Sequence, residues 1–133
     1  PAGRVDIGLF GTTCPKSVNN VLHYIAKTEI NDKKYEGTSF FKIVPKFIIQ
    51  GGDISTNNGT GHTSVYNNDY IEDEINKNVT FCETGLVALA NKGKNTNGCQ
   101  FFFTLDELPN LNGDYTIIGR VLKGYDKLKA IST

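Results

Sequence analysis

Several features that would assign a protein to a class directly are scarce or missing from this sequence. Lysine and arginine together match aspartate and glutamate at 14 each, so the formal net charge is zero. A neutral chain has no basic field for nucleic acid or for an anionic membrane surface, and we expect neither partner. No apolar run approaches the roughly 18 residues that a membrane span needs. Charge and hydropathy therefore indicate neither a nucleic-acid-binding protein nor a membrane protein.

Cysteine is also scarce, with only Cys14, Cys82 and Cys99 in the chain. An odd and sparse set of cysteines does not suggest a disulfide framework. No CxxC or HxxxH pair occurs, so a structural zinc site is not expected. The cysteine pattern predicts a reducing compartment, cytoplasmic or nuclear.

The common signatures of nucleophilic and phosphate chemistry are missing as well. There is no GxSxG motif, no readable Cys/His pairing, and the stretch NKGKNTNG lacks the GxxxxGK[ST] form of a phosphate loop. His23 and His62 are interpreted as a structural helix residue and a polar loop residue. Glu72, Asp73 and Glu74 could do acid–base work, but a solvated acidic loop is the favoured interpretation. We expect no metal and no cofactor.

The chain does contain enough apolar material for one packed domain. It has 133 residues, 38% of them hydrophobic, and eight phenylalanines and six tyrosines supply bulky core side chains. This predicts a single globular domain over residues 1–133 rather than a disordered tail. The chain opens at Pro1 without a methionine, and we expect the domain to be truncated at one or both ends.

Hydrophobic periodicity predicts the secondary structure. Val5, Ile7 and Leu9 alternate with other residues, which is typical of a half-buried strand. Pro45 divides two further strands because it lacks the donor that a central ladder needs. The Gly-, Asn-, Ser- and Thr-rich stretch 51–68 predicts a long ordered loop, a type that is often functional. Strands are predicted over 4–10, 39–44, 47–50, 85–90, 99–104 and 114–121.

In two segments the apolar residues recur at helical spacing. One covers 12–28, with Pro15 in its first turn and Thr13 or Cys14 as a candidate cap. The other covers 124–131. The order of a strand, a helix, many short strands and a final helix favours a sandwich or a barrel. The apolar positions at helical spacing are Val18, Val21, Leu22 and Ile25 in the first helix and Tyr125, Leu128 and Ile131 in the second.

Five segments, taken in order, form one pattern over nearly the whole chain. They are GRVDIGLFGTTCPKSVNNVL, FFKIVPKFIIQGGD, NGTGHTSVY, GLVALANKGKNTNGCQFFFT and LNGDYTIIGRV. This pattern resembles the cyclophilins, the peptidyl-prolyl cis-trans isomerases, of which the chain looks like a divergent member. The resemblance implies a mainly β fold, a closed antiparallel β-barrel capped by two α-helices. Its substrate groove would lie outside the barrel, and the last strand of the family is expected to be absent from this chain.

The activity that the resemblance implies is consistent with the absence of nucleophile and phosphate-binding motifs. Rotation about an Xaa-Pro bond must break amide resonance, with a barrier of about 18–20 kcal/mol. No bond is made, so neither a nucleophile nor a cofactor is needed. The site has to hold the proline ring and favour the twisted amide, through a donor aimed at the prolyl nitrogen.

The resemblance also implies the site residues. Lys42, Gln50 and Phe47 take the catalytic positions, with Gln50 bonding the substrate backbone. From the residues alone, barrel core is the favoured interpretation of the apolar positions, and only the resemblance reverses it. Within FFKIVPKFIIQ, barrel filling is expected for Phe40, Ile43 and Ile49, and a groove-facing position for Phe47, Ile48 and Gln50. The substrate-binding positions are Ile48, Gly59, Thr60, Ala90, Asn91, Gln100, Phe102, Asn110, Leu111 and Tyr115; Gly59 and Thr60 match the rim of a neighbouring pocket that receives residues before the proline.

This sequence departs from the family pattern at its centre. Lys42 stands where active cyclophilins carry an arginine, so the charge remains but the planar donor fork is lost. Asn110 stands where cyclosporin-sensitive members have a tryptophan, and weak cyclosporin binding is expected. Phe41 and Tyr115 stand at positions where histidines are usual, and Leu89 replaces a common methionine.

Two functions are consistent with this pattern. One is a prolyl isomerase of reduced activity, and the other is a catalytically silent module that binds proline peptides within a larger assembly. In either case we expect a monomer whose partners are proline-containing peptides or proteins.

Overall fold

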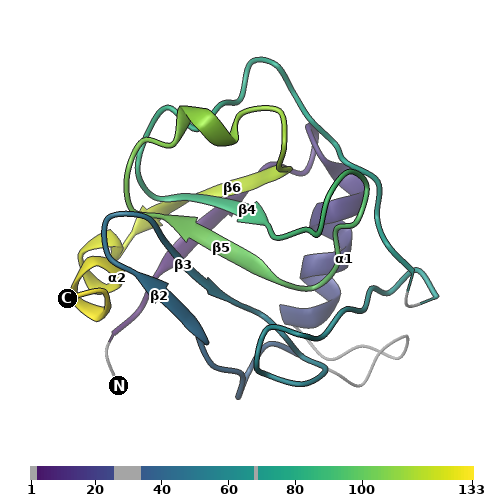
Figure 1. Cartoon of the computed structure of the whole chain (residues 1–133), viewed down its shortest axis with the longest axis horizontal. Coiled ribbons are helices and arrows are strands. Elements are labelled where there is room, and N and C mark those ends of the chain that lie inside the picture. Colours follow the sequence, from purple (N-terminus) through teal and green to yellow (C-terminus); the bar gives the residue numbers. More distant parts are fainter. Residues whose placement is uncertain (1–2, 26–33, 68) are drawn as a thin grey trace.

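The computed structural model describes residues 3–25, 34–67 and 69–133 (Figure 1). Each predicted strand and helix has a counterpart there, usually shorter by one to a few residues because the ends of a periodic pattern extend into turns. The short 3₁₀ helix η1 was not predicted, and positions 26–28 of the predicted first helix lie outside the described residues. The elements are β1 (Asp6–Leu9), α1 (Pro15–Ile25), β2 (Lys42–Val44), β3 (Ile48–Gly51), β4 (Leu86–Leu89), β5 (Phe101–Thr104), η1 (Pro109–Leu111), β6 (Ile117–Lys123) and α2 (Tyr125–Ile131).

The strands form one antiparallel sheet in the order β1-β6-β4-β5-β3-β2. The prediction of a mainly β fold with two helices is confirmed. The closed barrel is not detected, because β1 and β2 stand at opposite ends of this order and no pairing joins them among the described residues. No helix within the described ranges is long and apolar enough to cross a membrane.

Neighbouring residues on the central strands separate into two apolar clusters, as a side-chain period of two requires. On β3, Ile49 joins the first cluster and Ile48 the second; on β5, Phe103 and Phe102 divide in the same way. Both helices pack on the first cluster. It contains Cys14, Val18, Val21, Ile49, Val87, Leu89, Phe103, Ile118 and Leu128, and the second contains Ile48, Phe81, Leu86, Ala88, Phe102, Leu108 and Ile117.

Helix α1 buries a different face from the one predicted. Val18 and Val21 are buried, but Leu22 and Ile25 are 50% and 55% exposed. Ser17, Asn20 and Tyr24 are buried in their place, and Asn20 is fully enclosed because its amide oxygen accepts the backbone N–H of Val65 at 2.8 Å. The helix therefore packs on a polar loop as well as on the apolar core.

The N-terminus of α1 is capped from a distant loop rather than by Thr13 or Cys14, whose side chains both donate back to the Phe10 carbonyl, Cys14 also to the carbonyl of Ile117. The Glu74 carboxylate accepts the backbone N–H groups of Lys16 and Ser17, at 3.3 and 2.7 Å, and the Ser17 hydroxyl at 2.7 Å. The two backbone N–H groups are among the donors that a helix start leaves unpaired.

The acidic run 72–74 is therefore only partly solvated, which corrects the prediction of a solvated acidic loop. Glu72 is exposed and pairs with Lys16 at 3.2 Å. Asp73 accepts the Asn97 side-chain amide at 2.7 Å and the Asn95 N–H at 3.2 Å, so it fastens two loops together. Only one of the three carboxylates is left on a solvated surface.

Strand β2 is an edge, which explains two wrong assignments to the core. Phe40 and Ile43 are each 39% exposed, whereas Ile49, paired with Ile43 across the ladder, is fully buried. Nothing described lies beyond β2 to cover the outer side of these residues. Phe40 still makes edge-to-face contacts with Phe101 and Phe103, with ring centroids 6.5 and 6.1 Å apart.

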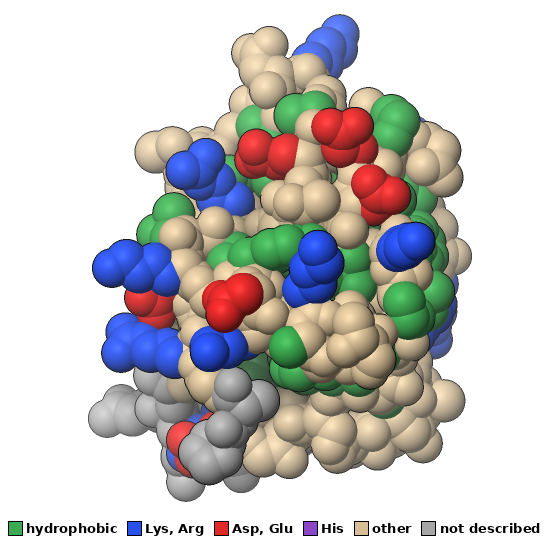
Figure 2. Space-filling model, turned by 90° about the vertical axis from the view of Figure 1, so that its left-hand side faces the viewer, with side chains coloured by type: hydrophobic (Ala, Val, Ile, Leu, Met, Phe, Trp, Pro, Cys, Tyr) green, Lys and Arg blue, Asp and Glu red, His purple; other side chains and the backbone are tan. Residues whose placement is uncertain are grey.

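The surface mixes charges of both signs. Figure 2 shows Lys and Arg side chains interspersed with Asp and Glu on one face of the molecule, with apolar side chains visible between them. This agrees with the zero net charge of the chain.

Candidate functional site

A pocket of about 250 Å³ opens over the second apolar cluster. Strands β2 and β3 supply one side, the two residues after β4 and the middle of β5 form the base, and η1 with the segment before β6 closes the other side. Its lining residues are Lys42, Phe47, Ile48, Gln50, Ala90, Asn91, Phe102, Leu111 and Tyr115.

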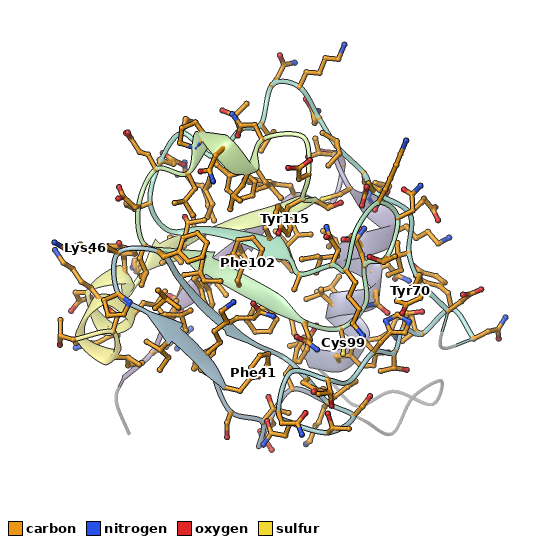
Figure 3. All side chains as sticks on the ribbon, viewed as in Figure 1. Phe41, Lys46, Tyr70, Cys99, Phe102 and Tyr115 are labelled. Carbon is orange, nitrogen blue, oxygen red and sulfur yellow. The ribbon has the colours of Figure 1, made fainter. Side chains whose placement is uncertain are left out.

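Aromatic rings form the base of this pocket. Phe102 is stacked on Phe81 with centroids 6.2 Å apart, and Tyr115 meets both rings edge-on at 5.3 and 6.3 Å (Figure 3). Phe81 and Phe102 are buried, and the Phe81 N–H is fixed by the Asn112 side chain at 2.7 Å. The arrangement gives a firm apolar surface of a kind suited to a small saturated ring.

Lys42 and Gln50 are directly paired across the β2–β3 ladder. Lys42 is exposed, and its ammonium forms no ion pair with a described residue. Its side chain lines the pocket from the edge strand β2. The site thus has one cation beside an apolar pocket.

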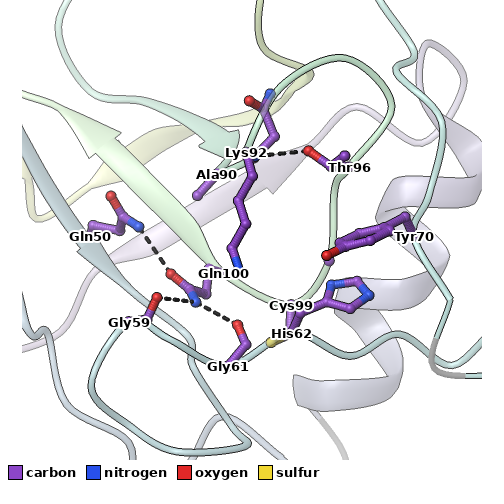
Figure 4. Close-up of a pocket in the computed structure, with 12 residues that line it drawn as sticks. Gln50, Gly59, Gly61, His62, Tyr70, Ala90, Lys92, Thr96, Cys99 and Gln100 are labelled. Atoms are coloured by element: carbon purple, nitrogen blue, oxygen red, sulfur yellow. Dashed lines mark hydrogen bonds between the residues drawn. The ribbon is translucent and has the colours of Figure 1, made fainter.

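Gln50 is held by an amide chain (Figure 4). Its side-chain N–H donates to the Gln100 amide oxygen at 3.0 Å. Gln100 then donates through its own side-chain nitrogen to the carbonyls of Gly59 at 3.1 Å and Gly61 at 2.7 Å. Because Gln100 is fixed by these two carbonyls and in turn accepts from Gln50, the loop 53–61 sets the orientation of Gln50.

That loop is itself organised by one buried carboxylate. Asp53 is fully buried and accepts six hydrogen bonds, from the N–H groups of Ser55, Thr56, Asn58, Gly59 and Gly61 and from the Thr56 hydroxyl, at 2.7–3.3 Å. Burial alone raises the pKa of Asp53, but hydrogen bonds led by those from Thr56, Gly61 and Gly59 outweigh it and hold the pKa far below its usual range.

A second pocket adjoins the first and shares Gln50, Ala90 and Asn91 with it. The rings of His62 and Tyr70 lie against each other on its far side, with centroids 3.8 Å apart and planes tilted by 31°. The Cys99 thiol lies at its base, fully buried, and burial raises its pKa, so it remains a neutral thiol at physiological pH. Its other lining residues are Gly59, Gly61, Lys92, Thr96, Gly98 and Gln100.

Comparison with known proteins identifies the fold family. The family model for "Cyclophilin type peptidyl-prolyl cis-trans isomerase/CLD" matches residues 1–133. The chain belongs to the cyclophilin family. A Cryptosporidium parvum cyclophilin-type isomerase of known structure superposes with a TM-score of 0.90 at 38% identity, covering 99% of this chain and 79% of that one. Its structure in the presence of the dipeptide Ala-Pro gives a TM-score of 0.86 at 36% identity, covering 99% and 80%.

Two cyclophilin relatives are named as isomerases. The rhodopsin-specific peptidyl-prolyl isomerase of Calliphora vicina is 44% identical over 98% of this chain and 55% of its own length. Peptidyl-prolyl isomerase B of Saccharomyces cerevisiae is 39% identical over 97% of this chain and 62% of its own length. The chain therefore spans somewhat more than half of these relatives.

The structure brings most of the cyclophilin site residues together. Nine of those predicted from the resemblance line the first pocket, and Gly59 and Gln100 line the second. Thr60 and Asn110 line neither: Thr60 is exposed and its hydroxyl donates to Asn58 at 2.7 Å, and Asn110 is exposed on η1. The roles of all thirteen stay predictions.

Several residues of the second pocket were not singled out by the sequence. Lys92 and Thr96 belong to the loop NKGKNTNG, where the backbone N–H of Lys92 donates to the Thr96 hydroxyl at 2.8 Å. Tyr70 is separated from that loop by more than twenty residues. A bridge between Ile71 and Asn97 joins the two segments, with N–H to O distances of 2.9 and 3.2 Å. No local sequence pattern announces such a pairing.

Proposed function

We propose that this chain catalyses cis-trans isomerisation of Xaa-Pro bonds, at a lower rate than cyclophilins with an arginine at the position of Lys42. One observation carries the proposal: a cation and an oriented amide, Lys42 and Gln50, face each other across a ladder beside an apolar pocket with an aromatic base. Solved and curated relatives named as isomerases support it.

In this mechanism the proline ring enters the first pocket and rests on Phe102, with Phe47 and Leu111 beside it. Gln50 binds the peptide backbone and prevents it from turning with the ring. The Lys42 ammonium donates to the prolyl nitrogen, whose lone pair is available only when the amide is twisted. The interaction is therefore stronger in the transition state than in either planar form, which is the condition for catalysis.

The reduced rate follows from the freedom of Lys42. A guanidinium can donate to several groups in one fixed plane, whereas an ammonium on a flexible stem is more strongly hydrated and must be ordered on binding. Loss of one well-placed donor typically costs about 2.7–4 kcal/mol, a factor of about 10²–10³ in rate. Since lysine keeps the charge, the expected loss is smaller than this.

The same observation favours a second candidate, a proline-peptide binding module without turnover. The apolar pocket and Gln50 need no cation to hold a peptide, and Lys42 is not fixed by any described residue. The Ala-Pro dipeptide named for the Cryptosporidium parvum relative supports proline peptides as the ligand class for either function.

Peptide exchange by NMR separates the two. For a weak isomerase, exchange broadening of an Xaa-Pro peptide should be visible with the unaltered protein, fall about tenfold in Lys42→Ala and rise about tenfold or more in Lys42→Arg. Lys46→Arg is the matched control, because Lys46 lies on the exposed β2–β3 turn outside the pocket (Figure 3). Binding without any exchange in the unaltered protein would leave the module as the function.

A further inference from the structure

We propose that Asn112 and Phe81 are positioning residues of the first pocket, and that by holding two of its walls at a fixed separation they make it select a five-membered ring. Neither residue lines the pocket. The inference rests on the proposed function, because it requires an Xaa-Pro peptide to bind in the first pocket.

The Phe81 ring packs behind the aromatic base of the pocket. It is fully buried and lies nearly parallel to the Phe102 ring, with 9° between the planes. The Tyr115 ring meets Phe81 edge-on at 90°. Phe102 and Tyr115 both line the pocket. Because a close-packed interior leaves little free space, a displacement of Phe81 must also displace the two rings that touch it.

The backbone of Phe81 is bound at both of its polar groups by the residues that flank η1. Its carbonyl accepts the N–H of Leu108 at 3.0 Å, and its N–H donates to the Asn112 side-chain oxygen at 2.7 Å. Leu108 and Asn112 are the two caps of η1. We call this pair of hydrogen bonds the Phe81 clamp. Leu111 is the last residue of η1 and lines the pocket, so the clamp fixes the Leu111 wall relative to the aromatic base.

The turn between the two bonds of the Phe81 clamp is closed internally. The Leu111 N–H donates to the Leu108 carbonyl at 2.9 Å, and the Asn112 N–H donates to the Pro109 carbonyl at 3.1 Å. A short turn closed in this way moves as one unit. If Asn112 releases Phe81, Leu111 is therefore held against the base from one end only, and the pocket can widen.

Asn112 is the part of the clamp that can be removed with the least disturbance. The residue is exposed, so its truncation to alanine takes away no buried side chain. The Phe81 N–H, by contrast, belongs to a fully buried residue and would lose its acceptor. An unpaired buried donor is costly, which favours a shift of the backbone toward water. Asn112→Asp keeps an oxygen at the same position along the side chain and can keep the bond.

The expected selection can be measured with a ring that differs by one methylene. Pipecolic acid is the six-membered homologue of proline and forms the same tertiary amide. One methylene in an apolar pocket typically changes binding by about 10–200-fold. We expect about tenfold, the lower end of this range, because Phe47 and Leu111 are only half-buried and can yield.

The test uses two peptides, Ala-Ala-Pro-Ala and the same sequence with pipecolic acid in place of the proline. NMR titration gives their dissociation constants with the unaltered protein, Asn112→Ala and Asn112→Asp, and the same samples give the isomerisation rates. Hydrogen–deuterium exchange of the Phe81 backbone amide reports whether the clamp is formed. The control is Glu74→Ala, which removes an acceptor of a backbone N–H, also at 2.7 Å, from the start of α1 and outside the pocket.

The unaltered protein should bind the proline peptide about tenfold more tightly than the pipecolate peptide. In Asn112→Ala this ratio should fall to about twofold and the Phe81 amide should exchange faster, whereas Asn112→Asp and Glu74→Ala should keep both values. A general loss of stability would lower neither the ratio nor the protection of this one amide selectively.

Three results overturn the positioning role: equal affinity for the two rings in the unaltered protein, an unchanged ratio in Asn112→Ala, or an equal fall of the ratio in Glu74→Ala. If isomerisation of the proline peptide is seen alongside any of these, the proposed function stands without the clamp. If the ratios change as expected and no peptide is isomerised, the clamp stands and the catalytic proposal fails. Absence of binding by either peptide overturns both.

Discussion

Asn110 lies exposed on η1, one residue before the groove residue Leu111. By the resemblance it takes the place of the tryptophan of cyclosporin-sensitive members, and its short side chain lacks both an indole donor and a large apolar face. We predict that Asn110→Trp strengthens cyclosporin binding about tenfold, since a hydrogen bond is worth about 1 kcal/mol and the buried ring adds to it. Titration calorimetry measures this directly.

The control for Asn110→Trp is Glu107→Trp, which adds the same ring to an exposed position outside both pockets. It should leave cyclosporin affinity unchanged. If both variants bind alike, the indole does not act at the groove and the assignment of Asn110 is wrong.

At the scale of elements, the loop 53–61 depends on Asp53. The pKa of Asp53 is lowered in the folded protein, so the Asp53 carboxylate stabilises the fold at pH values above the unfolded pKa of about 3.9. This stabilisation is lost as the pH falls below that value toward the folded pKa. We predict that Asp53→Asn lowers the free energy of unfolding at pH 7 by about 2–4 kcal/mol, because the amide leaves buried donors unpaired.

Urea unfolding between pH 7 and pH 2.5 checks this prediction. The difference in the free energy of unfolding between the unaltered protein and Asp53→Asn should become smaller as the pH falls below about 4. A constant gap across the range would mean that the carboxylate charge does not hold the loop.

Helix α1 gives a second test at this scale, because two acids near its start have different roles. Glu74 accepts three hydrogen bonds at the N-terminus, whereas Glu72 makes an exposed pair with Lys16. We predict that Glu74→Ala lowers the free energy of unfolding by about 1–2 kcal/mol, the usual cost of a lost cap. Glu72→Ala should change it by less than about 0.5 kcal/mol. Equal effects in thermal or urea unfolding would contradict the capping role.

Elements could be predicted from this sequence where their cause is local. Alternation over Val5 to Leu9 and helical spacing over Tyr125 to Ile131 are set by neighbouring residues, and both elements are found. The exposure of Ile43 could not be predicted, because it depends on β2 being an edge of the sheet. Equally, nothing near Glu74 in the sequence indicates the helix start that it caps.

The candidate site, too, could be predicted only in part. The first pocket gathers around residues of quoted motifs, such as Phe47, Gln50 and Phe102, so a family pattern locates it. The second pocket needs the bridge from Ile71 to Asn97, which joins two loops of irregular backbone. Pairings of this kind have no periodicity, so only the fold shows that Lys92 and Tyr70 line the same pocket.

For the molecule as a whole, both faces of the sheet carry a buried apolar cluster, and the first pocket lies on only one of them. Phe102 and Phe103 are adjacent on β5 and almost equally buried, at 2% and 3% exposure. Phe103 packs in the cluster that both helices cover, with ring contacts to Phe40 and Phe101. Phe102 lies in the other cluster and forms the base of the first pocket.

We predict that Phe102→Leu and Phe103→Leu each lower the free energy of unfolding by about 1–2 kcal/mol, because each removes part of a buried ring from a packed cluster. Only Phe102→Leu should weaken binding of an Xaa-Pro peptide, since Phe103 faces away from the groove. Urea unfolding gives the first quantity and NMR titration of the folded protein gives the second. Similar losses of affinity in both variants would show that the two faces are not independent and that the groove responds to packing throughout the sheet.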